Sequence, residues 1–581
     1  MDPSTEKRIR ATLLGRYPEF GYRGGAADYQ ASRDPGGHSW LVSAPDCPRA
    51  FEEGLRGPSV SIALLRRGTP VLGVVNAFSW PDDNGDLFAW AEGMRSILRN
   101  GCPVASGSRR VAATMAVSGH ADQNSRVYAA LAAPYRFRAV PGLALRLALV
   151  AAGEAAGCHS PSGPGGHGYC AGHALLRAVG MELRDERGCP VVYSQEGISP
   201  SGAICAAGPE PGVHEFVSPG WQRLAQAPRD PEEPYDLVAP SRRRLISDPG
   251  LLGRALGCLL GQLAGDALGS LVEFETPSRI AARYPQGVRQ MEDGGTHDTI
   301  AGQPTDDSEM ALVMARAILQ QGCYDSEAAA RAYCWWHGSG PFDIGSTVAA
   351  ALGQGAVAAQ QPGTSVSEAC RRAANLRSEA NGALMRVAPL GILGAGAGAE
   401  RASYWADQDS LLTHPNLVCR HANSIFAASL AFAIGQGADA RATYEFALAE
   451  ARRIRAGSSL LDVLKLAAME RPHDYVTSQG HVIIALQNAF YQALHAPSLE
   501  DGIADTIMRG GDTDTNAAIA GALLGAIHGR AAIPFQWLDR LLTCRPIQGI
   551  AGVRRPRPKA FWPVDAPVLA EQLLWLGRHQ T

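Results

Sequence analysis

Acids and hydroxyls stand directly in front of an apolar run at two places in the sequence. They are Thr305, Asp306 and Asp307 in PTDDSEMAL, and Asp512, Asp514 and Thr515 in GGDTDTNAAIAGALLGA. One such cluster is usually a helix cap, because carboxylates at a helix N-terminus gain about 0.3–1 kcal/mol from the free N–H groups and the helix dipole. Oxygen ligands with no His or Cys nearby also suit Mg²⁺, Mn²⁺ or Ca²⁺ better than Zn²⁺. If the two clusters face each other, they predict a site for one or two hard cations.

Two apolar runs near these clusters carry glycine at every fourth position. Gly253, Gly257, Gly261, Gly265 and Gly269 share one run, and Gly521, Gly525 and Gly529 share the other. This spacing places the glycines on one ridge of a helix. Because glycine inside a helix costs about 1 kcal/mol relative to alanine, the ridge predicts close approach of another backbone.

The chain has 581 residues, which is too many for one ordinary core and predicts at least two domains. A stretch rich in proline and charge, around residues 210–250, is typical of a linker. Before it, residues 58–78 predict two strands joined by a turn at RRGT, and helical periodicity follows at PGLALRLALVAAGEAAG and CAGHALLRAVGME. After it, nearly every apolar pattern is helical. We therefore predict an α/β domain over 1–210, a linker over 211–250 and an all-α domain over 251–581.

The composition excludes several classes of protein. Hydrophobic residues make up 46% and charged residues 19%, the net charge is −3 and the pI is about 6.6. These values do not indicate a nucleic-acid or anionic-membrane partner. The sequence shows no secretory signal and no uninterrupted apolar run long enough for a bilayer. Its 12 scattered cysteines, without a CxxC pair, predict reduced thiols in a cytoplasm; the oligomeric state stays open.

Six motifs in a fixed order carry a resemblance to a known family. Between residues 261 and 526 they are GQLAGDALGSLVEF, PTDDSEMAL, PFDIGST, NGALMRVAPLGI, THPN and GGDTDTNAAIAGALLGA. Together they resemble the ADP-ribosylglycohydrolase family, which includes the dinitrogenase-reductase activating glycohydrolases, over about residues 251–550. The resemblance implies a compact all-α fold, a binuclear Mg²⁺ or Mn²⁺ site, and cleavage of the bond between ADP-ribose and an acceptor.

The resemblance also implies roles for individual residues. The implied metal ligands are Thr305, Asp306, Asp307, Asp512, Asp514 and Thr515. Glu273 occupies the place of a metal-associated glutamate near the scissile bond, and Asp306, Asp307 or Glu273 would move the proton at the anomeric bond. The implied substrate-binding residues are Gly345, Asn381, Gly382, Ala383, Met385, His414 and Tyr491, since backbone N–H groups near glycine can reach phosphate oxygens. As alternatives, Asn381–Gly382 is a simple turn, His414 is a surface loop residue, and Trp335 and Trp336 are core residues.

The first 205 residues resemble the inositol-monophosphatase family, whose members are α/β sandwiches with metal-binding carboxylates. Here the family's WxxDPxDGT has become WLVSAPDCP, so Ser43 replaces one aspartate and only Asp46 remains. Its GEE segment reads GGAA, and its WDxAAG reads HGYCAG with Gly168 in place of aspartate. Because one aspartate cannot hold the usual metals, we predict that this domain is not a metal-dependent phosphatase and instead serves substrate recognition or assembly. A zinc site is an alternative reading of Cys158, His159, His167, Cys170 and His173.

The resemblance therefore implies a hydrolase that binds two Mg²⁺ or Mn²⁺ ions. Its substrate would be an ADP-ribosylated protein, with arginine as the acceptor that the bacterial branch implies, and its product would be ADP-ribose. Serine, a nucleic-acid base or a free ADP-ribose derivative are alternative acceptors. A protein that binds such ligands without turnover, and a bifunctional phosphatase–hydrolase, are the alternative functions. The C-terminal stretch RRPRPKAFWPVDAPVLAEQLLWLG predicts only a loop and a short packing helix.

Overall fold

The computed structural model describes residues 4–25, 28–104, 114–160, 165–201, 204–207, 224 and 228–580. These residues form two compact units, one of Met1–Pro231 with Pro240–Arg243 and one of Glu232–Ala239 with Arg244–Thr581. The predicted linker at 211–250 contributes residues to both units, and its positions 211–223 and 225–227 lie outside the described residues.

The N-terminal unit contains an eight-stranded sheet with the order β2-β1-β3-β4-β5-β6-β7-β8. The strands are β1 Gly21–Arg23, β2 Tyr29–Gln30, β3 His38–Ser43, β4 Val60–Arg66, β5 Thr69–Ala77, β6 Asp86–Ala91, β7 Leu98–Arg99 and β8 Cys102–Pro103. Only the β1–β3 pair is parallel among these neighbours. The predicted hairpin over 58–78 is confirmed, because β4 and β5 pair from Val60↔Asn76 to Arg66↔Thr69 around Arg67 and Gly68, which both have positive φ.

A second, five-stranded sheet in this unit has the order β10-β9-β11-β13-β12. Its strands are β9 Thr114–Val117, β10 Arg136–Ala139, β11 Gly157–Ser160, β12 Glu182–Asp185 and β13 Ile204–Ala207. The helices are α1 Ser4–Arg16, α2 Pro48–Glu53, α3 Ser125–Ala132, α4 Leu143–Ala151 and α5 Gly166–Ala178. Helices α4 and α5 pack on each other; α5 lies against β3–β6 and α4 against β9, β11 and β13. The predicted α/β sandwich and its two helices are thus confirmed. The prediction that both helices are amphipathic is wrong for α4, because all nine of its residues are buried.

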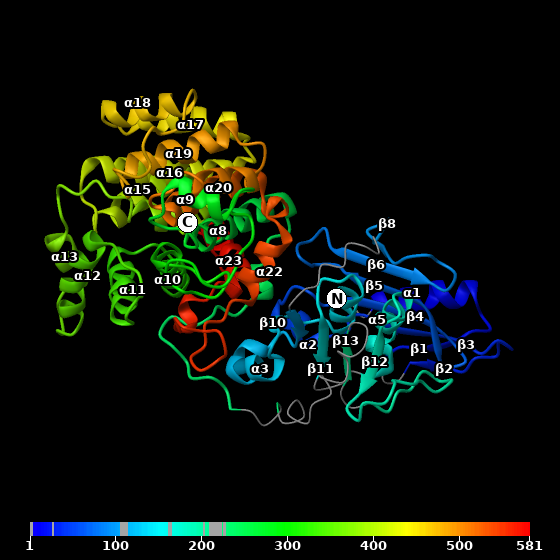
Figure 1. Cartoon of the computed structure of the whole chain (residues 1–581). Coiled ribbons are helices and arrows are strands. Elements are labelled where there is room, and N and C mark those ends of the chain that lie inside the picture. The colour runs from blue at the N-terminus through cyan, green and yellow to red at the C-terminus, as the bar shows by residue number, and fades with distance from the viewer. Residues whose placement is uncertain are drawn as a thin grey trace. The chain divides into compact units, whose positions relative to one another are not determined.

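The regular structure described in the C-terminal unit is helical (Figure 1), as predicted. Its α-helices are α8 Pro249–Gly269, α9 Pro277–Arg283, α10 Asp306–Gln321, α11 Ser326–Gly338, α12 Ser346–Ala359, α13 Val366–Ala373, α14 Ala388–Ala397, α15 Ala399–Ser410, α16 Leu417–Gln436, α17 Ala440–Arg453, α18 Ser458–Ala467, α19 Val482–His495, α20 Leu499–Ile507, α21 Thr513–His528, α22 Phe535–Thr543 and α23 Ala566–Arg578. Helix α16 is long and apolar enough to cross a membrane, but 72% of its apolar window is buried in the bundle. A mostly buried helix of this kind is typical of a protein core.

Helices α8 and α21 are the most closely packed pair in this unit. A Cβ on Gly257 would lie 2.2 Å from the carbonyl oxygen of Gly525, and a Cβ on Gly265 would lie 2.0 Å from that of Ala517. The predicted backbone approach is confirmed for these positions, whereas Gly253 has no atom within 4 Å of its Cβ position. Because the pairing runs antiparallel, the C-terminal end of α8 meets the N-terminal end of α21, where a Cβ on Gly269 would lie 2.4 Å from the Cα atom of Asp514.

Candidate active site

The two predicted acid clusters come together at the helix starts of α10 and α21. Thr305 and Asp512 are the N-cap residues of these helices, yet neither side chain bonds to a backbone N–H of its own first turn. The Thr305 side chain is instead directed to acids, with Oγ1 3.0 Å from Asp307 Oδ2 and 3.4 Å from Asp514 Oδ2, and the Asp512 carboxylate accepts a bond from Asn381. Simple helix capping therefore does not account for these residues.

Asp266, at the end of α8, takes over the capping of α10. Its carboxylate accepts the backbone N–H of Thr305 at 3.0 Å, that of Ser308 at 3.1 Å, and the Thr305 hydroxyl at 3.0 Å. The sequence analysis missed Asp266, although an acid in the glycine ridge GQLAGDALG was a usable signal. A buried carboxylate in an otherwise apolar helix needs partners, and this one binds α10 to the α8–α21 pair.

The acids form two groups that share one member. Ligand atoms of Asp266, Asp307 and Asp514 all lie within 4.8 Å of one another, and so do those of Glu273, His297, Asp343 and Asp514. Sequence reasoning missed His297 and Asp343; Asp343 lies in PFDIG, the motif from which only Gly345 was selected. An arrangement of two donor groups around Asp514 could hold two cations next to each other.

Burial raises the pKa values of several carboxyl groups in this cluster. Burial, reinforced by neighbouring carboxylates, raises the pKa of Asp306, Asp307 and Asp514 well above the ordinary aspartate value. Burial also raises the pKa of Asp266 to about 6 and that of Glu273 to about 7. So many desolvated carboxylates repel one another unless protons or cations compensate their charge.

The donor set fits hard divalent cations. Asp307 Oδ1 is buried and has no hydrogen-bond partner among the described residues. The remaining donors are carboxylate and hydroxyl oxygens, with His297 as one imidazole, which suits Mg²⁺ or Mn²⁺ better than a thiol-binding metal. Thr515 is 6% exposed at the same helix start, and its N–H donates to Asp514 Oδ1 at 2.9 Å. Thr513 Oγ1 donates to the Gly269 carbonyl at 2.7 Å and fixes α21 to α8.

The NGALMR loop lies beside the cluster. Asn381 Nδ2 donates to Asp512 Oδ2 at 2.7 Å, and Asn381 N donates to the Gly480 carbonyl at 2.9 Å. A Cβ on Gly382 would lie 3.0 Å from Cε1 of His414, so this glycine permits the contact. Ala383 and Met385, in the same loop, are buried. Gly345 is exposed at the N-terminus of α12, with nothing within 4 Å of its Cβ position.

His414 is fully buried, so its alternative reading as a surface loop residue is wrong. Burial and the nearby charge of Arg386 lower its pKa to about 3, which keeps the ring neutral. Nδ1 is 2.8 Å from the Thr413 hydroxyl, and Nε2 has no partner within the described part of the chain. Arg386 itself is buried against Asp409 at 2.8 Å and also donates to the Gly382 carbonyl at 3.2 Å. This network fixes the loop from behind.

Tyr491, Trp335 and Trp336 lie outside the two groups of clustered acids. Tyr491 lines a cavity of about 470 Å³ with Arg471, whose guanidinium lies 5.1 Å from the ring centre, and none of the clustered acids lines that cavity. Trp336 is a fully buried core residue whose Nε1 donates to Glu309 at 2.7 Å. Trp335 is half-buried against Phe561, with ring centres 5.2 Å apart.

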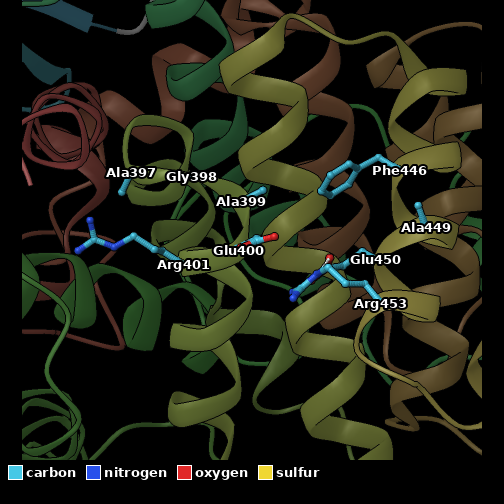
Figure 2. A pocket seen from close by; sticks show the side chains of 9 residues that line it. All are labelled: Ala397, Gly398, Ala399, Glu400, Arg401, Phe446, Ala449, Glu450 and Arg453. Atoms are coloured by element: carbon cyan, nitrogen blue, oxygen red, sulfur yellow. Dashed lines mark hydrogen bonds and ion pairs between the residues drawn. The ribbon is translucent and has the colours of Figure 1, made fainter. Parts of the chain in front are cut away.

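A further cavity of about 570 Å³ lies between α15 and α17 (Figure 2). Its lining residues are Ala397, Gly398, Ala399, Glu400, Arg401, Phe446, Ala449, Glu450 and Arg453. Glu450 and Arg453 pair with each other at 2.6 Å, and Arg401 donates to Gln580 at 3.0 Å. The acids of the two donor groups do not line this cavity, so it offers no comparable set of metal-binding oxygens.

In the N-terminal unit the surviving acid has a structural role. Asp46 Oδ1 accepts the Ser59 N–H at 2.7 Å, and Oδ2 accepts the Ala144 N–H at the start of α4 at 3.0 Å. Arg146, a cation, is buried in α4 and donates to the His159 carbonyl at 2.7 Å.

Among the described residues, groups of three or more potential metal ligands occur only in the helical unit, so the cysteines and histidines considered for zinc do not converge. Ala26 and Ala27 of GGAA lie outside the described residues.

Comparison with known proteins agrees with this division of the chain. The inositol monophosphatase family model matches residues 46–211. ADP-ribosylarginine hydrolase Tri1 of Pseudomonas putida (strain GB-1) is 28% identical, over 59% of this chain and 88% of the relative. ADP-ribosyl-[dinitrogen reductase] glycohydrolase of Rhodospirillum rubrum is 29% identical, over 51% of this chain and 92% of the relative. A solved structure titled ADP-ribosylglycohydrolase-related protein complex is 27% identical, covers 55% of this chain and 98% of its own, and has a TM-score of 0.44. The ADP-ribosylglycohydrolase family model matches residues 247–560, more than half of the 581 residues, and the chain belongs to that family.

Proposed function

We propose that this protein is a metal-dependent hydrolase that releases ADP-ribose from modified arginine in proteins. The observation that carries the proposal is the buried acid cluster in which Asp514 is shared by two donor groups and Asp307 Oδ1 has no protein partner among the described residues. Membership in the family supports hydrolysis of an ADP-ribosyl bond. The arginine acceptor is supported by the name of the Pseudomonas putida relative.

Two Mg²⁺ or Mn²⁺ ions are the proposed cofactors. The residues that would hold them are Thr305, Asp306, Asp307, Asp512, Asp514 and Thr515. Bound there, the ions would polarise the substrate and lower the pKa of a bound water. Asn381, which donates to Asp512, would orient that carboxylate for its ion. The close backbone packing of α8 and α21 supports fixed positions for the oxygen donors at their ends.

Among the three candidates for proton transfer, Glu273 is favoured over Asp306 and Asp307. Its pKa of about 7 suits a group that gives a proton near neutral pH and takes it back. It precedes Phe274, which is 58% exposed, so the chain reaches solvent directly after Glu273. Asp307 is only 1% exposed, deeper in the cluster.

Substrate contacts are proposed for the loops beside the acids. Gly345, Asn381, Gly382, Ala383 and Met385 would line the diphosphate and distal ribose. At Gly345 the free N–H groups at the start of α12 are available to phosphate oxygens. His414, neutral and fixed behind Gly382, would shape the ribose side of this loop. Tyr491 remains a weaker proposal for base stacking, because its ring already contacts Arg471 and His495.

The N-terminal unit is proposed to recognise the substrate or to support assembly, without phosphatase activity. Both oxygens of Asp46 accept backbone N–H groups of the fold, and among the described residues Asp46 belongs to no group of three or more potential metal ligands. We also propose a cytoplasmic location, since the described cysteines are free and even Cys334 and Cys370, with sulfurs 3.9 Å apart, are not linked.

The decisive experiment incubates the full chain with ADP-ribosyl-arginine and ADP-ribosyl-serine substrates, with Mg²⁺ or Mn²⁺ and with a chelator. Release of ADP-ribose from the arginine substrate, lost with chelator and in Asp307→Asn, supports the proposal. Release only from the serine substrate would change the acceptor. Tight binding of ADP-ribose without release would instead favour a binding protein.

A further inference from the structure

A short hairpin outside the predicted motifs closes over Glu273. Gly294 and Thr299 exchange both backbone hydrogen bonds, at 2.7 and 3.0 Å, so that residues 295–298 form a tight loop. Gly295 has a φ of 76° and lies so close to the chain after α8 that a Cβ would come 2.7 Å from the Cα atom of Leu271. Glycine is required here for both conformation and space.

The loop is bonded to the backbone of the segment that carries Glu273. Thr296 N donates to the Ser270 carbonyl at 3.0 Å, and Thr296 Oγ1 donates to the Glu273 carbonyl at 3.0 Å. These two bonds set the position of the next residue, His297. Its Nε2 lies 2.6 Å from Glu273 Oε2 and 3.6 Å from Asp343 Oδ2. While Glu273 is ionised its carboxylate only accepts hydrogen bonds, so in that state the imidazole Nε2–H is the donor.

The stretch RRPRP, for which the sequence predicted only a loop, holds the hairpin from the other side. Arg555 Nε donates to the His297 carbonyl at 2.9 Å, and Gln303 Nε2 donates to the Arg555 carbonyl at 2.7 Å. Two residues later, Arg557 is buried and pairs with Glu309 of α10 through bonds of 2.8 and 2.7 Å. The segment therefore connects the hairpin to the same helix that presents Asp306 and Asp307.

The imidazole is confined by its surroundings. The His297 side chain is 13% exposed and Glu273 only 5%, and the ring centre of His297 lies 5.5 Å from that of Phe342. With its backbone bonded to Arg555 and its ring packed against Phe342, His297 has little freedom to leave the carboxylate. A glutamate side chain otherwise has several rotamers, so a fixed partner at 2.6 Å selects one.

We propose that His297 is a positioning residue that holds the Glu273 carboxylate for proton transfer, with Arg555 fixing the histidine through its backbone. The proposal rests on the proposed function, in which Glu273 moves the proton at the anomeric bond. Partners that orient a catalytic group typically contribute about 10- to 100-fold to activity. The alternative role, a nitrogen ligand of a cation beside Asp514, makes a different prediction for metal affinity.

The test compares His297→Phe, which keeps a ring without an N–H, with His297→Gln, which keeps a donor. Both variants of the full chain are assayed for ADP-ribose release, and their Mn²⁺ affinity is measured by electron paramagnetic resonance. We expect His297→Phe to lower kcat by about 10- to 100-fold, with KM and Mn²⁺ affinity within about threefold of wild type. His297→Gln should recover part of the loss, and His297→Phe added to Glu273→Gln should cause no further loss.

A matched control is available on the surface. His473 also bonds to a glutamate, Glu470, at 3.1 Å, but its side chain is 82% exposed, so His473→Phe should leave every measurement unchanged. Mn²⁺ affinity weakened more than about tenfold in His297→Phe would identify a metal ligand and overturn the positioning role. An unchanged kcat would also overturn it.

A readout independent of turnover separates this proposal from the proposed function. In the Mg²⁺-loaded protein, the short bond should give a downfield imidazole N–H resonance in the proton NMR spectrum, absent in His297→Phe and in Glu273→Gln. No such resonance in the wild type would overturn the positioning contact even if hydrolysis occurs. A wild-type protein that shows the resonance but releases ADP-ribose from no substrate would overturn the proposed function, and with it the catalytic purpose of the contact.

Discussion

Gly261 and Gly521 lie against each other so closely that neither tolerates a side chain. A Cβ on Gly261 would come 2.2 Å from the Gly521 carbonyl oxygen, and a Cβ on Gly521 would come 2.1 Å from that of Gly261. Real Cβ atoms do not approach backbone at such distances, so α8 and α21 would have to separate. Since α8 ends beside Asp266 and α21 begins beside Asp514, this packing also fixes the distance between acids from two helices.

The first prediction follows from this contact. We expect Gly261→Ala to lower the free energy of unfolding by about 1–3 kcal/mol, the usual cost of overpacking, despite the better helix propensity of alanine. It should also weaken Mn²⁺ binding, because the donor groups shift. Gly253→Ala is the matched control on the same ridge: its Cβ meets no atom within 4 Å, so stability should rise by up to about 1 kcal/mol. Urea unfolding of both variants checks this, and equal effects would contradict it.

The second prediction concerns Asp307. Its burial and the charges of Asp266 and Asp512 make the carboxylate costly in the metal-free protein. We therefore expect Asp307→Asn to raise the melting temperature in the presence of chelator and to remove the stabilisation by Mg²⁺ or Mn²⁺. For a cation at 100 times its dissociation constant that stabilisation is about 2.7 kcal/mol in the wild type.

A matched control for Asp307→Asn is Asp439→Asn, at the exposed N-cap of α17, where the side chain accepts the Ala442 N–H at 2.8 Å. This variant should keep the full metal response, because asparagine also caps helices well. A wild-type metal response in Asp307→Asn, measured by calorimetry, would remove Asp307 from the ligand set.

The sequence predicted the parts of this site that depend on local pattern. Four-residue glycine spacing was sufficient to infer that another backbone approaches each ridge, because glycine inside a helix otherwise only costs stability. That α8 and α21 are each other's partners follows from the structure. The acids of α10 and α21 were found because they stand together directly in front of apolar runs. Asp266 was not found, although an acid inside a glycine ridge that predicts close packing was a usable signal of a buried carboxylate. Its role appears only when the start of α10 is placed beside it.

Asp343 lies in the motif PFDIG, which the sequence did indicate, whereas His297 was beyond pattern reasoning for a different physical reason. His297 lies in GGTHDT, a loop without periodicity, and reaches Glu273 only because the hairpin closes and Arg555 holds its carbonyl. Such contacts between distant segments depend on tertiary packing, which no local propensity encodes. For the same reason the order of the eight strands in the N-terminal sheet could not be inferred, whereas the β4–β5 hairpin could, from its turn residues.

The third prediction is a pH dependence of the metal-free protein. Burial raises the pKa of Asp266 to about 6 and of Glu273 to about 7, above the values of unfolded carboxyls. Below about pH 3 both carboxyls are protonated in the folded and in the unfolded state, so these groups have no net effect on stability. As the pH rises toward 7 the unfolded chain releases its protons first, so the folded state binds more protons and stability falls.

We therefore expect the urea midpoint in the presence of chelator to decrease steadily from about pH 4.5 to about pH 7.5. With saturating Mg²⁺ the decrease should be smaller, because the cation binds the ionised carboxylates and replaces the protons. Glu273→Gln should flatten the upper part of the metal-free curve, near the pKa of the group it removes. A metal-free protein that becomes more stable over this range would contradict the assignment of raised pKa values.

The fourth prediction concerns Asp46, the one acid left from the metal site of the inositol-monophosphatase pattern. Its two oxygens satisfy the backbone N–H groups of Ser59 and Ala144, and it is 4% exposed. Asp46→Ala would leave both N–H groups unpaired in a buried region, so we expect the free energy of unfolding to fall by about 1–3 kcal/mol for each N–H group left unsatisfied. ADP-ribose release should keep its wild-type rate under conditions where the variant is folded, because the acid cluster that carries the chemistry lies in the other unit.

The control is Asp82→Ala, which removes a single exposed bond, to the Asn84 N–H, and should change stability by less than about 0.5 kcal/mol. If Mg²⁺ stabilises the wild-type N-terminal unit and Asp46→Ala removes that effect without destabilising the metal-free protein, Asp46 is a metal ligand and its structural role is wrong. Calorimetry of the full chain with and without Mg²⁺ distinguishes the two outcomes, because the structural role requires the loss of stability to persist in chelator.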